Sequence, residues 1–398
     1  MSAPTIAFVL FKYFPHGGLQ RDFMRIAHAC VARGARVQVH TLAWVGDRPA
    51  GFDVHVPDIR AFTNHRRYAR FAAHLQAVFA RSPVDLVVGF NRVPGLDVHF
   101  AADPCFAARA ATRGALYRAT PRCRHFLAFE RAVFAPAAHT QVLVLTAAQQ
   151  QEFMAAHGTQ AERFTLLPPG IARDRMAGDD APVLRASLRA ELGLEADERL
   201  LLLLGSGFRV KGLARALQAI AALPPAQRAR THLLAVGQDA AGPFVGMAHR
   251  LGLGSQVRIQ PGRDDVPRLL QGADLLIHPA HAETAGMVLL EAIVAGLPVL
   301  TTDTCGYAHH VSNAAAGVVL PSPFAQPALD AALAGMLAGL HDAPTAARWR
   351  SNGIAYGRAQ DLYGMPGAVA RTLLVRAREA GERSGTGGGR GDGHVPAC

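Results

Sequence analysis

Short apolar runs alternate along the chain with longer stretches in which apolar residues recur every three or four positions. The runs at residues 5–11 and 37–42 flank a helical pattern over residues 20–33. A short apolar run predicts a buried strand, and a period near 3.6 predicts an amphipathic helix. The alternation is typical of a parallel α/β sheet, and further strands are expected at residues 84–90 and 142–146.

A second series of the same kind follows the break Pro168-Pro169-Gly170, with strands expected at residues 200–204, 232–236, 257–260, 275–277 and 299–302. Stiff prolines followed by a glycine are typical of a hinge between domains. The sequence therefore predicts two doubly wound, Rossmann-like α/β domains over residues 1–168 and 169–355, which face each other across a cleft. We expect a helical segment over 356–380 to close the fold, and a disordered tail over 381–398 because few apolar residues occur there.

Composition limits the class of protein. The chain has 398 residues, 50% of them hydrophobic, which is too long for one ordinary domain. Its longest apolar stretch is broken by Glu291 and Pro298, and no basic leader precedes the first strand, so neither a bilayer-spanning helix nor a secretory signal is expected. The five cysteines form no C-x-x-C pair and the histidines lack ligand spacing. We therefore predict no metal site and a reducing, cytoplasmic environment.

The charge of the chain points to an anionic partner. A formal net charge of +11 fits nucleic acid, an acidic membrane surface or a phosphorylated substrate. One region combines arginines with aromatic residues and almost no acids. By composition a solvated helix face over core aromatics is favoured; the alternative is a segment that lies on an anionic leaflet. Its arginines are Arg109, Arg113, Arg118, Arg122, Arg124 and Arg131, interleaved with Phe106, Tyr117, Phe126 and Phe129.

The sharpest local signal is a pair of carboxylates, Glu283 and Glu291, around the start of an apolar helix. A helix beginning near Gly286 would expose free N–H groups there, and these can hold a diphosphate together with the helix dipole. The alternative interpretation is two solvated glutamates. The residues assigned to this site are Glu283, Ala285, Gly286, Met287, Val288 and Glu291.

Two further segments suit phosphate binding. Arg209 and Lys211 lie between an expected strand and a helix, where cations can neutralise a leaving diphosphate. Gly17 and Gly18 follow the first strand, so their backbone can approach a phosphate closely. Solvated surface charges and an ordinary tight turn are the respective alternatives. A G-x-G-x-x-G motif is absent, which counts against a dinucleotide-dependent dehydrogenase.

The sequence around the two glutamates resembles a known family. The E-x7-E spacing, His278-Pro279 before it and residues 295–299 after it look like the nucleotide-sugar site of the retaining GT-B glycosyltransferases, which include sucrose and glycogen synthases. Residues 12–23, 100–103, 167–171 and 303–308 more closely resemble the lipopolysaccharide core glucosyltransferase I family. The similarity spans about residues 5 to 375.

The resemblance implies transfer of glucose from UDP-glucose to the inner-core heptose of lipopolysaccharide, with retention of configuration and neither a metal nor another cofactor. In the donor domain, Glu291 would bind the ribose, Glu283 the sugar hydroxyls and Arg263 the uracil. Lys211 and Arg209 would hold the diphosphate, although Ser206 stands where many relatives carry the arginine, so Arg209 is a substitute.

Two assignments keep a structural alternative beside the resemblance. Asp103 would be an acceptor-side acid, or the N-cap of a helix ahead of Pro104. Arg173 would contact phosphate, or be a surface arginine. The sequence leaves open both front-face attack, with Lys211 and Arg209 stabilising the leaving group, and double displacement through a carboxylate nucleophile.

The implied acceptor is a phosphorylated lipid of the inner membrane, which changes how the arginines near residues 109–131 are interpreted. We expect them to bind the anionic membrane surface, placing a cytoplasmic enzyme peripherally on the inner face. The rival within enzymes is a GT-B transferase that uses UDP-galactose, UDP-N-acetylglucosamine or GDP-mannose. A basic nucleic-acid-binding protein is a weaker alternative, and because recognition motifs are absent we expect no nucleic acid partner.

Overall fold

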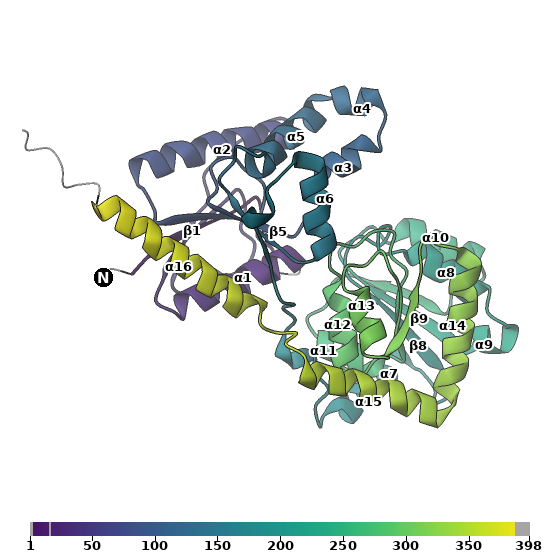
Figure 1. Cartoon of the computed structure of the whole chain (residues 1–398). Coiled ribbons are helices and arrows are strands. Elements are labelled where there is room, and N and C mark those ends of the chain that lie inside the picture. Colours follow the sequence, from purple (N-terminus) through teal and green to yellow (C-terminus); the bar gives the residue numbers. More distant parts are fainter. Residues whose placement is uncertain (1–2, 16, 387–398) are drawn as a thin grey trace, which may run out of the picture. The chain divides into compact units, whose positions relative to one another are not determined.

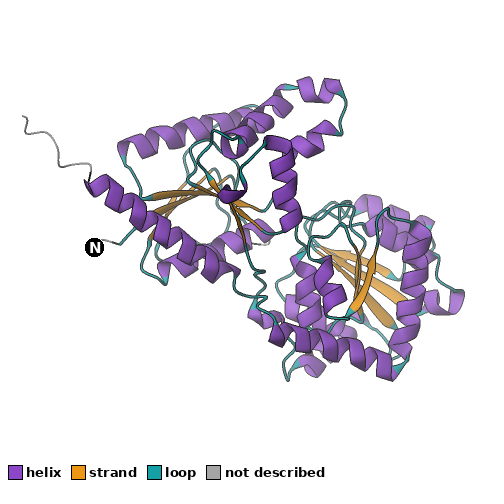
Figure 2. Ribbon diagram, in the orientation of Figure 1, coloured by secondary structure: helices purple, strands orange, loops and turns teal. Residues whose placement is uncertain are grey.

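The computed structural model describes residues 3–15 and 17–386 and divides into two compact α/β units (Figure 1). The first unit comprises Met1–Leu167 and the segment from Met365 onward, and the second comprises Pro168–Gly364. The second unit thus begins at Pro168, the first residue of the expected hinge. Figure 2 shows helices on both faces of the strands in each unit.

The first unit contains a seven-stranded, all-parallel sheet in the order β3-β2-β1-β4-β5-β6-β7. The order reverses between β1 and β4, and ligands of doubly wound sheets bind outside the carboxyl ends of strands at such a switch point. The strands are β1 (Thr5–Leu10), β2 (Arg36–Thr41), β3 (Phe52–His55), β4 (Leu86–Gly89), β5 (Val98–Ala101), β6 (Gln141–Val144) and β7 (Phe164–Leu166).

Helices cover both faces of this sheet because its central strands are buried on both sides. Phe8 of β1 packs edge-on against Phe23 with ring centroids 5.8 Å apart, and both rings are fully buried. The helices of this unit are α1 (Gly18–Val31), α2 (Asn64–Arg81), α3 (Phe106–Ala111), α4 (Ala115–Ala119), α5 (Pro121–Phe134), α6 (Ala147–His157) and α16 (Met365–Thr386).

The second unit repeats the arrangement with a six-stranded parallel sheet in the order β10-β9-β8-β11-β12-β13. Its switch point lies between β8 and β11. The strands are β8 (Arg199–Leu204), β9 (Thr231–Val236), β10 (Val257–Gln260), β11 (Leu275–His278), β12 (Val299–Thr302) and β13 (Gly317–Leu320). All five strands expected in this half of the sequence are present, and β13 is an additional one.

The β8 strand reads Arg-Leu-Leu-Leu-Leu-Leu without alternation because helices cover both of its faces. Leu201, Leu203 and Leu217 belong to one core cluster. The helices of the second unit are α7 (Ala181–Leu192), α8 (Leu213–Ala221), α9 (Pro225–Ala229), α10 (Gly242–Arg250), α11 (Val266–Gly272), α12 (Met287–Val294), α13 (Ala308–Asn313), α14 (Gln326–His341) and α15 (Ala343–Ala359).

The C-terminal region differs from the expectation in two ways. The helical segment expected over 356–380 is divided, since α15 ends at Ala359 in the second unit and α16 returns to the first unit, where it packs against α1, β1 and β4. Gly364 and Pro366 lie at the break, where both residue types interrupt a helix.

The start predicted for the disordered tail, residue 381, is also too early in the chain. Because α16 continues to Thr386, residues 381–386 are helical, and residues 387–398 lie outside the described residues. Across residues 3–15 and 17–386, no helix combines the length and the apolar character needed to cross a bilayer.

Candidate active site

The loop between β8 and α8 is shaped by three glycines with positive φ, namely Gly205 at 121°, Gly207 at 86° and Gly212 at 80°. A Cβ atom on Gly212 would lie 2.0 Å from the carbonyl oxygen of Pro279, so only glycine permits this close approach of two backbones. The glycines therefore bring the loop after β8 against the segment after β11, at the switch point of the sheet.

Asp239, beyond the end of β9, fixes the same loop. Its Oδ2 accepts hydrogen bonds from the backbone N–H groups of Gly207 at 2.5 Å and Phe208 at 2.6 Å. A charged acceptor makes these bonds stronger than neutral ones. Sequence analysis missed Asp239, because its role depends on β8 and β9 being neighbours in the sheet.

Lys211 and Glu283 form an ion pair through Nζ and Oε2, with side chains that are 17% and 18% exposed. Lys211 belongs to the loop after β8. Glu283 follows β11, and its backbone pairs with Cys305 in an isolated bridge. Both side chains assigned to the diphosphate and the sugar hydroxyls are therefore neighbours at the β8 and β11 switch point.

The pKa of Glu283 lies at about 2. Burial by itself would raise the pKa of this carboxyl, but His278 and the positive charge of Lys211 outweigh it and favour the carboxylate. The His278 ring, fully buried at the end of β11, has its Nε2 at 3.6 Å from Oε2 of Glu283. Burial lowers the pKa of His278, so its ring stays neutral at pH 7.

The helix α12 starts as expected, immediately after Gly286, which has φ 87° and acts as the N-cap. Ala285 and Val288 are buried beside it, and Met287 opens the helix. The Leu289 N–H donates to the Gly286 carbonyl oxygen at 3.0 Å. The N–H groups that precede it in the first turn have no acceptor within the helix, so they and the helix dipole favour an anion at this end.

Glu291 lies further along α12, is 6% exposed and pairs with Arg175 at 3.4 Å between Oε1 and Nε. Arg175 is 7% exposed and also binds Asp174 at 2.8 Å. Sequence analysis named Arg173 in this region but missed Arg175. The 116 positions between Arg175 and Glu291 leave no local pattern that could have revealed the pair.

The remaining second-unit assignments occupy different surroundings. Arg209 is exposed on the loop after β8. Arg263, after β10, is enclosed by carboxylates, with Nη2 at 2.6 Å from Asp265 and Nη1 at 2.8 Å from Glu191. Arg173 is exposed and its guanidinium stacks on the Tyr363 ring at 4.6 Å from the centroid. Arg263 and Arg173 thus contact side chains away from the switch point, whereas Lys211 and Arg209 lie on the loop beside it and Lys211 pairs with Glu283.

In the first unit, Gly17 is the N-cap of α1 and Gly18 its first residue, beyond the carboxyl end of β1. Asp103 follows β5 at the same edge of the sheet and is exposed. The alternative that Asp103 caps a helix is wrong, because the N-cap of α3 is Cys105, whose sulfur accepts from the Ala108 N–H at 3.5 Å. Pro104 separates the two positions.

The arginine-rich segment, residues 109–131, spans parts of α3 and α5 and all of α4, and all six of its arginines are exposed. Arg113 stacks on Tyr117 at 4.8 Å and Arg122 on Phe126 at 5.9 Å from the ring centroids. Glu130, the one acid in this segment, has no exposed surface. The exposed charge of the segment is therefore entirely positive, and Leu116, 90% exposed, adds an apolar contact group.

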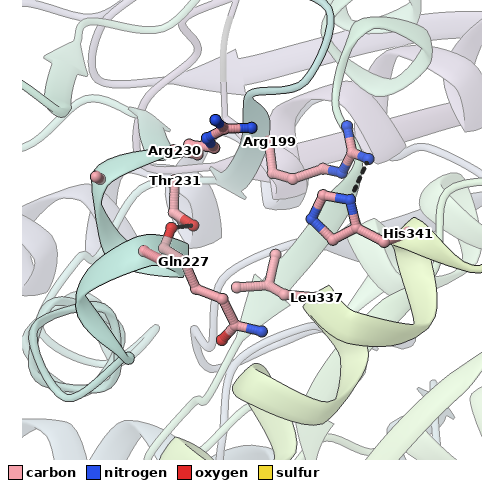
Figure 3. A pocket seen from close by; sticks show the side chains of 8 residues that line it. Arg199, Gln227, Arg230, Thr231, Leu337 and His341 are labelled. Carbon is pink, nitrogen blue, oxygen red and sulfur yellow. Dashed lines mark hydrogen bonds between the residues drawn. The ribbon is translucent and has the colours of Figure 1, made fainter.

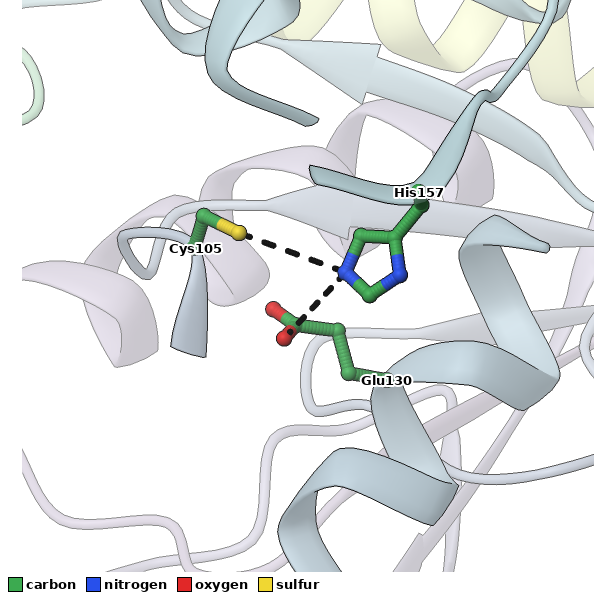
Figure 4. A group of neighbouring side chains, drawn as sticks. All are labelled: Cys105, Glu130 and His157. Atoms are coloured by element: carbon green, nitrogen blue, oxygen red, sulfur yellow. Dashed lines mark hydrogen bonds and ion pairs between the residues drawn. The ribbon is translucent and has the colours of Figure 1, made fainter. Parts of the chain in front are cut away.

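Glu130 also belongs to a cluster with Cys105 and His157, whose ligand-type atoms lie within 4.8 Å of one another (Figure 4). Such residues can bind a metal, but both oxygens of Glu130 accept backbone N–H groups, from Phe106 and Ala107 at 2.7 Å. Burial raises the pKa of the Cys105 thiol to about 11, so the free side chain is protonated at pH 7. The described contacts make the cluster part of a hydrogen-bonded network at the start of α3.

A cavity of 420 Å³ lies at the opposite edge of the second sheet (Figure 3). Arg199 and Thr231, at the amino ends of β8 and β9, line it together with His341. Arg199 Nη2 and His341 Nδ1 are 3.1 Å apart. None of the residues assigned to the candidate site lines this cavity, so its position at the amino ends of the strands separates it from the switch point.

Comparison with known proteins agrees with this geometry. Residues 185–356 match the family model described as Glycosyl transferases group 1. The lipopolysaccharide glucosyltransferase WaaG of Escherichia coli (strain K12) is 46% identical over 366 residues, which cover 92% of this chain and 97% of WaaG. D-inositol 3-phosphate glycosyltransferase of Mycobacterium sp. (strain KMS) is 27% identical over 187 residues, 45% of this chain and 41% of that protein.

Solved structures extend the comparison to the fold. The crystal structure of WaaG, a glycosyltransferase involved in lipopolysaccharide biosynthesis, has a TM-score of 0.88 at 46% identity and covers 92% of this chain and 99% of that chain. Anabaena HepE in complex with UDP and glucose has a TM-score of 0.71 at 21% identity, covering 94% of this chain and 100% of HepE. At 21% identity, the likeness to HepE shows a shared fold alone.

Two parallel Rossmann-like sheets, with the paired groups of the second unit at its switch point, define a GT-B glycosyltransferase, and the chain is a hexosyltransferase. Within this class, the chain belongs to the lipopolysaccharide glucosyltransferase family of which WaaG is a member. The GT-B fold and the resemblance stated from the sequence are thereby confirmed.

Proposed function

We propose that the chain transfers glucose from UDP-glucose to the inner-core heptose of lipopolysaccharide, with retention of configuration and without a metal. The observation that carries this proposal is the Lys211–Glu283 ion pair beside the start of α12. A cation, a carboxylate and a helix N-terminus lie together there, which supports binding of a nucleoside diphosphate sugar. The relationship to WaaG supports glucose as the transferred sugar.

The main requirement of this reaction is to stabilise the negative charge that develops on the leaving diphosphate. Lys211 and the first-turn N–H groups of α12 would stabilise it, with Arg209 on the same loop as a second cation. Glu283, ionised because its pKa is about 2, would accept hydrogen bonds from the sugar hydroxyls. In front-face attack a phosphate oxygen takes the acceptor proton, so retention needs no protein nucleophile.

Glu291 is proposed to hold the donor through both ribose hydroxyls. Its partner Arg175 keeps the carboxylate oriented by a contact at 3.4 Å and balances its charge in a buried environment. Since these bonds form before and during transfer, they would contribute mainly to donor binding.

The arginine-rich segment is proposed to hold the enzyme peripherally on the inner face of the inner membrane. Its six exposed arginines and the exposed Leu116 suit an anionic lipid surface, where each basic group contributes on the order of 1 kcal/mol. The acceptor-side group would be Asp103 in the same unit.

The experiment is a thermal-shift series with UDP-glucose, UDP-galactose, UDP and GDP, followed by transfer assays on lipopolysaccharide that lacks core glucose. A ligand at a hundred times its Kd stabilises a protein by about 2.7 kcal/mol, so UDP-glucose and UDP should raise the Tm while GDP does not. The anomeric configuration of the product, read by NMR, tests retention. Stabilisation and transfer with UDP-galactose instead would replace the proposed donor.

Metal independence is tested in the same assay with excess EDTA. Because Lys211 and the α12 N-terminus supply the positive charge that magnesium provides elsewhere, the transfer rate should remain unchanged. Loss of transfer on chelation, restored by magnesium or manganese, would contradict this part of the proposal.

A further inference from the structure

A buried ion pair in the first unit joins α5 to the loop that follows β4. Glu130 of α5 has no exposed side-chain surface, and the Arg92 side chain is 13% exposed. Arg92 Nη1 lies 3.0 Å from Glu130 Oε1. Two charges are costly to bury, and further hydrogen bonds to the same groups offset part of that cost.

Glu130 uses its remaining capacity on the start of α3. Its Oε1 accepts the Phe106 N–H and its Oε2 the Ala107 N–H, each at 2.7 Å. Oε2 also lies 3.4 Å from Nε2 of His157, at the end of α6 (Figure 4). One carboxylate thereby fixes the first turn of α3, whose N–H groups have no acceptor within the helix.

Arg92 uses its other terminal nitrogen on the turn before α3. Nη2 donates to the carbonyl oxygens of Asp103 at 2.9 Å and Pro104 at 2.7 Å. Gln149 of α6, 4% exposed, donates from Nε2 to the carbonyl oxygen of Asp103 at 3.3 Å and to that of Ala101 at 2.6 Å. Two largely buried side chains thus hold the backbone of an exposed acid.

We propose that Glu130 and Arg92 are positioning residues that set the place of the Asp103 carboxylate relative to the arginine-rich segment. This inference rests on the proposed acceptor-side role of Asp103. Apolar residues of similar volume often stabilise a fold as well as a buried ion pair does. We therefore attribute to this pair the orientation of the backbone around Asp103 rather than a gain in stability. The fork of Arg92 is suited to that task, because one planar group binds the α5 carboxylate and the Asp103 carbonyl together.

The test compares Glu130→Gln and Arg92→Lys with Arg163→Lys in the full chain. The amide of Glu130→Gln has one carbonyl oxygen where two acceptors are needed, and the ammonium of Arg92→Lys cannot span both partners of the guanidinium. Arg163 is the matched control, since it also donates to main-chain carbonyls in the first unit, those of Thr140 at 3.0 Å and Ala135 at 2.7 Å. Those carbonyls do not include that of Asp103.

We expect kcat for transfer to fall about tenfold to a hundredfold in Glu130→Gln and Arg92→Lys, because misplacing a reacting group by about 1 Å has effects of this size. The donor KM and the Tm shift with UDP should stay at the wild-type values, because the hydrogen bonds and ion pairs of Glu130 and Arg92 involve none of the residues assigned to the donor. Arg163→Lys should keep the wild-type kcat even if its Tm falls by as much as the Tm values of the two network variants. Wild-type kcat in both network variants would overturn the inference.

A double-mutant cycle with Asp103→Ala separates this inference from the proposed function. If Glu130 acts through Asp103, adding Glu130→Gln to Asp103→Ala should reduce kcat by less than about twofold. A full additional loss would show that Glu130 acts elsewhere, and the inference would fail while the function stands. A wild-type rate in Asp103→Ala would remove the role of Asp103 and the inference with it. Absence of any glucose transfer by the wild-type protein would instead refute the proposed function.

Hydrogen exchange provides a readout that does not depend on activity. Amides of residues 105–108 should exchange at least about tenfold faster in Glu130→Gln than in wild type, because the amide keeps only one of the two oxygens that accept the Phe106 and Ala107 N–H groups. Arg163→Lys should leave that peptide protected. Unchanged protection of these amides in Glu130→Gln would overturn the inference, and this result can be obtained even when the protein preparation shows no transfer activity.

Discussion

Lys211 and Glu283 form an ion pair across the switch point of the second sheet, although 72 positions separate them in the chain. Sequence reasoning named both residues but assigned them to different parts of the donor. Each side chain compensates the charge of the other. Donor binding would therefore place the diphosphate next to a cation that is already oriented.

Replacing Lys211 by alanine should lower kcat by about a hundredfold or more, because charge on the leaving diphosphate develops mainly in the transition state. The pKa of Glu283 should rise from about 2, since Lys211 is one of the groups that hold it low. Steady-state kinetics and NMR titration of the carboxyl provide the two measurements. Turnover at the wild-type rate would refute the leaving-group role.

Glu291→Ala should raise the KM for donor with a smaller effect on kcat, because a ribose contact contributes to ground and transition states alike. Arg175→Met should weaken donor binding and also lower the free energy of unfolding by about 3 kcal/mol, since it leaves a buried carboxylate without its ionic partner. Calorimetric titration with UDP and urea unfolding measure these effects. A donor KM that is unchanged in Glu291→Ala would remove it from the donor site.

Replacing Arg118, Arg122 and Arg124 together by glutamine should reduce co-sedimentation with anionic vesicles, and wild-type binding should weaken with salt. The control changes Arg250, Arg348 and Arg358, which are exposed on the second unit, to glutamine. It removes the same charge, so a loss confined to the first variant assigns binding to the arginine-rich segment. Equal binding of both variants across the salt series would favour a solvated helix face.

His99 makes the first unit sensitive to acid. Burial, followed by the charge of Arg92, lowers its pKa to about 3, and its ring lies 3.0 Å from the Gly89 carbonyl through Nδ1. The unfolded chain therefore binds this proton first as the pH falls below about 6.5. The neutral His99 ring therefore contributes fully to the free energy of unfolding above about pH 6.5, and this contribution declines as the pH falls towards the pKa of His99 in the folded protein.

His99→Gln should consequently reduce the loss of unfolding free energy between about pH 6.5 and 4.5 by about 2 to 3 kcal/mol. Urea unfolding at a series of pH values measures the slope. His139→Gln, which changes an exposed histidine of the same unit, should leave the slope unchanged. A slope in His99→Gln equal to that of wild type would show that this ring is not the group responsible.

Much of the fold follows from local pattern. The start of α12 at Gly286 was predictable because a continuous apolar helical run begins immediately after this glycine. β13 was missed because Gly317–Leu320 is a short, half-buried run that lacks a strong period. The return of α16 to the first unit was also missed, because helical periodicity does not record which core a helix packs against.

By itself the sequence determined the class of fold, the strand and helix rhythm and the residue types needed for a nucleotide-sugar site. These depend on properties of short segments, such as burial of strands on both faces and free N–H groups at a helix start. Tertiary structure alone decided which side chains meet. Arg175 reaches Glu291, Asp239 holds the Gly207 loop and Arg92 links Glu130 to Asp103. Each contact joins residues from different elements, and the order of strands in the sheet, which no local pattern records, brings those elements together.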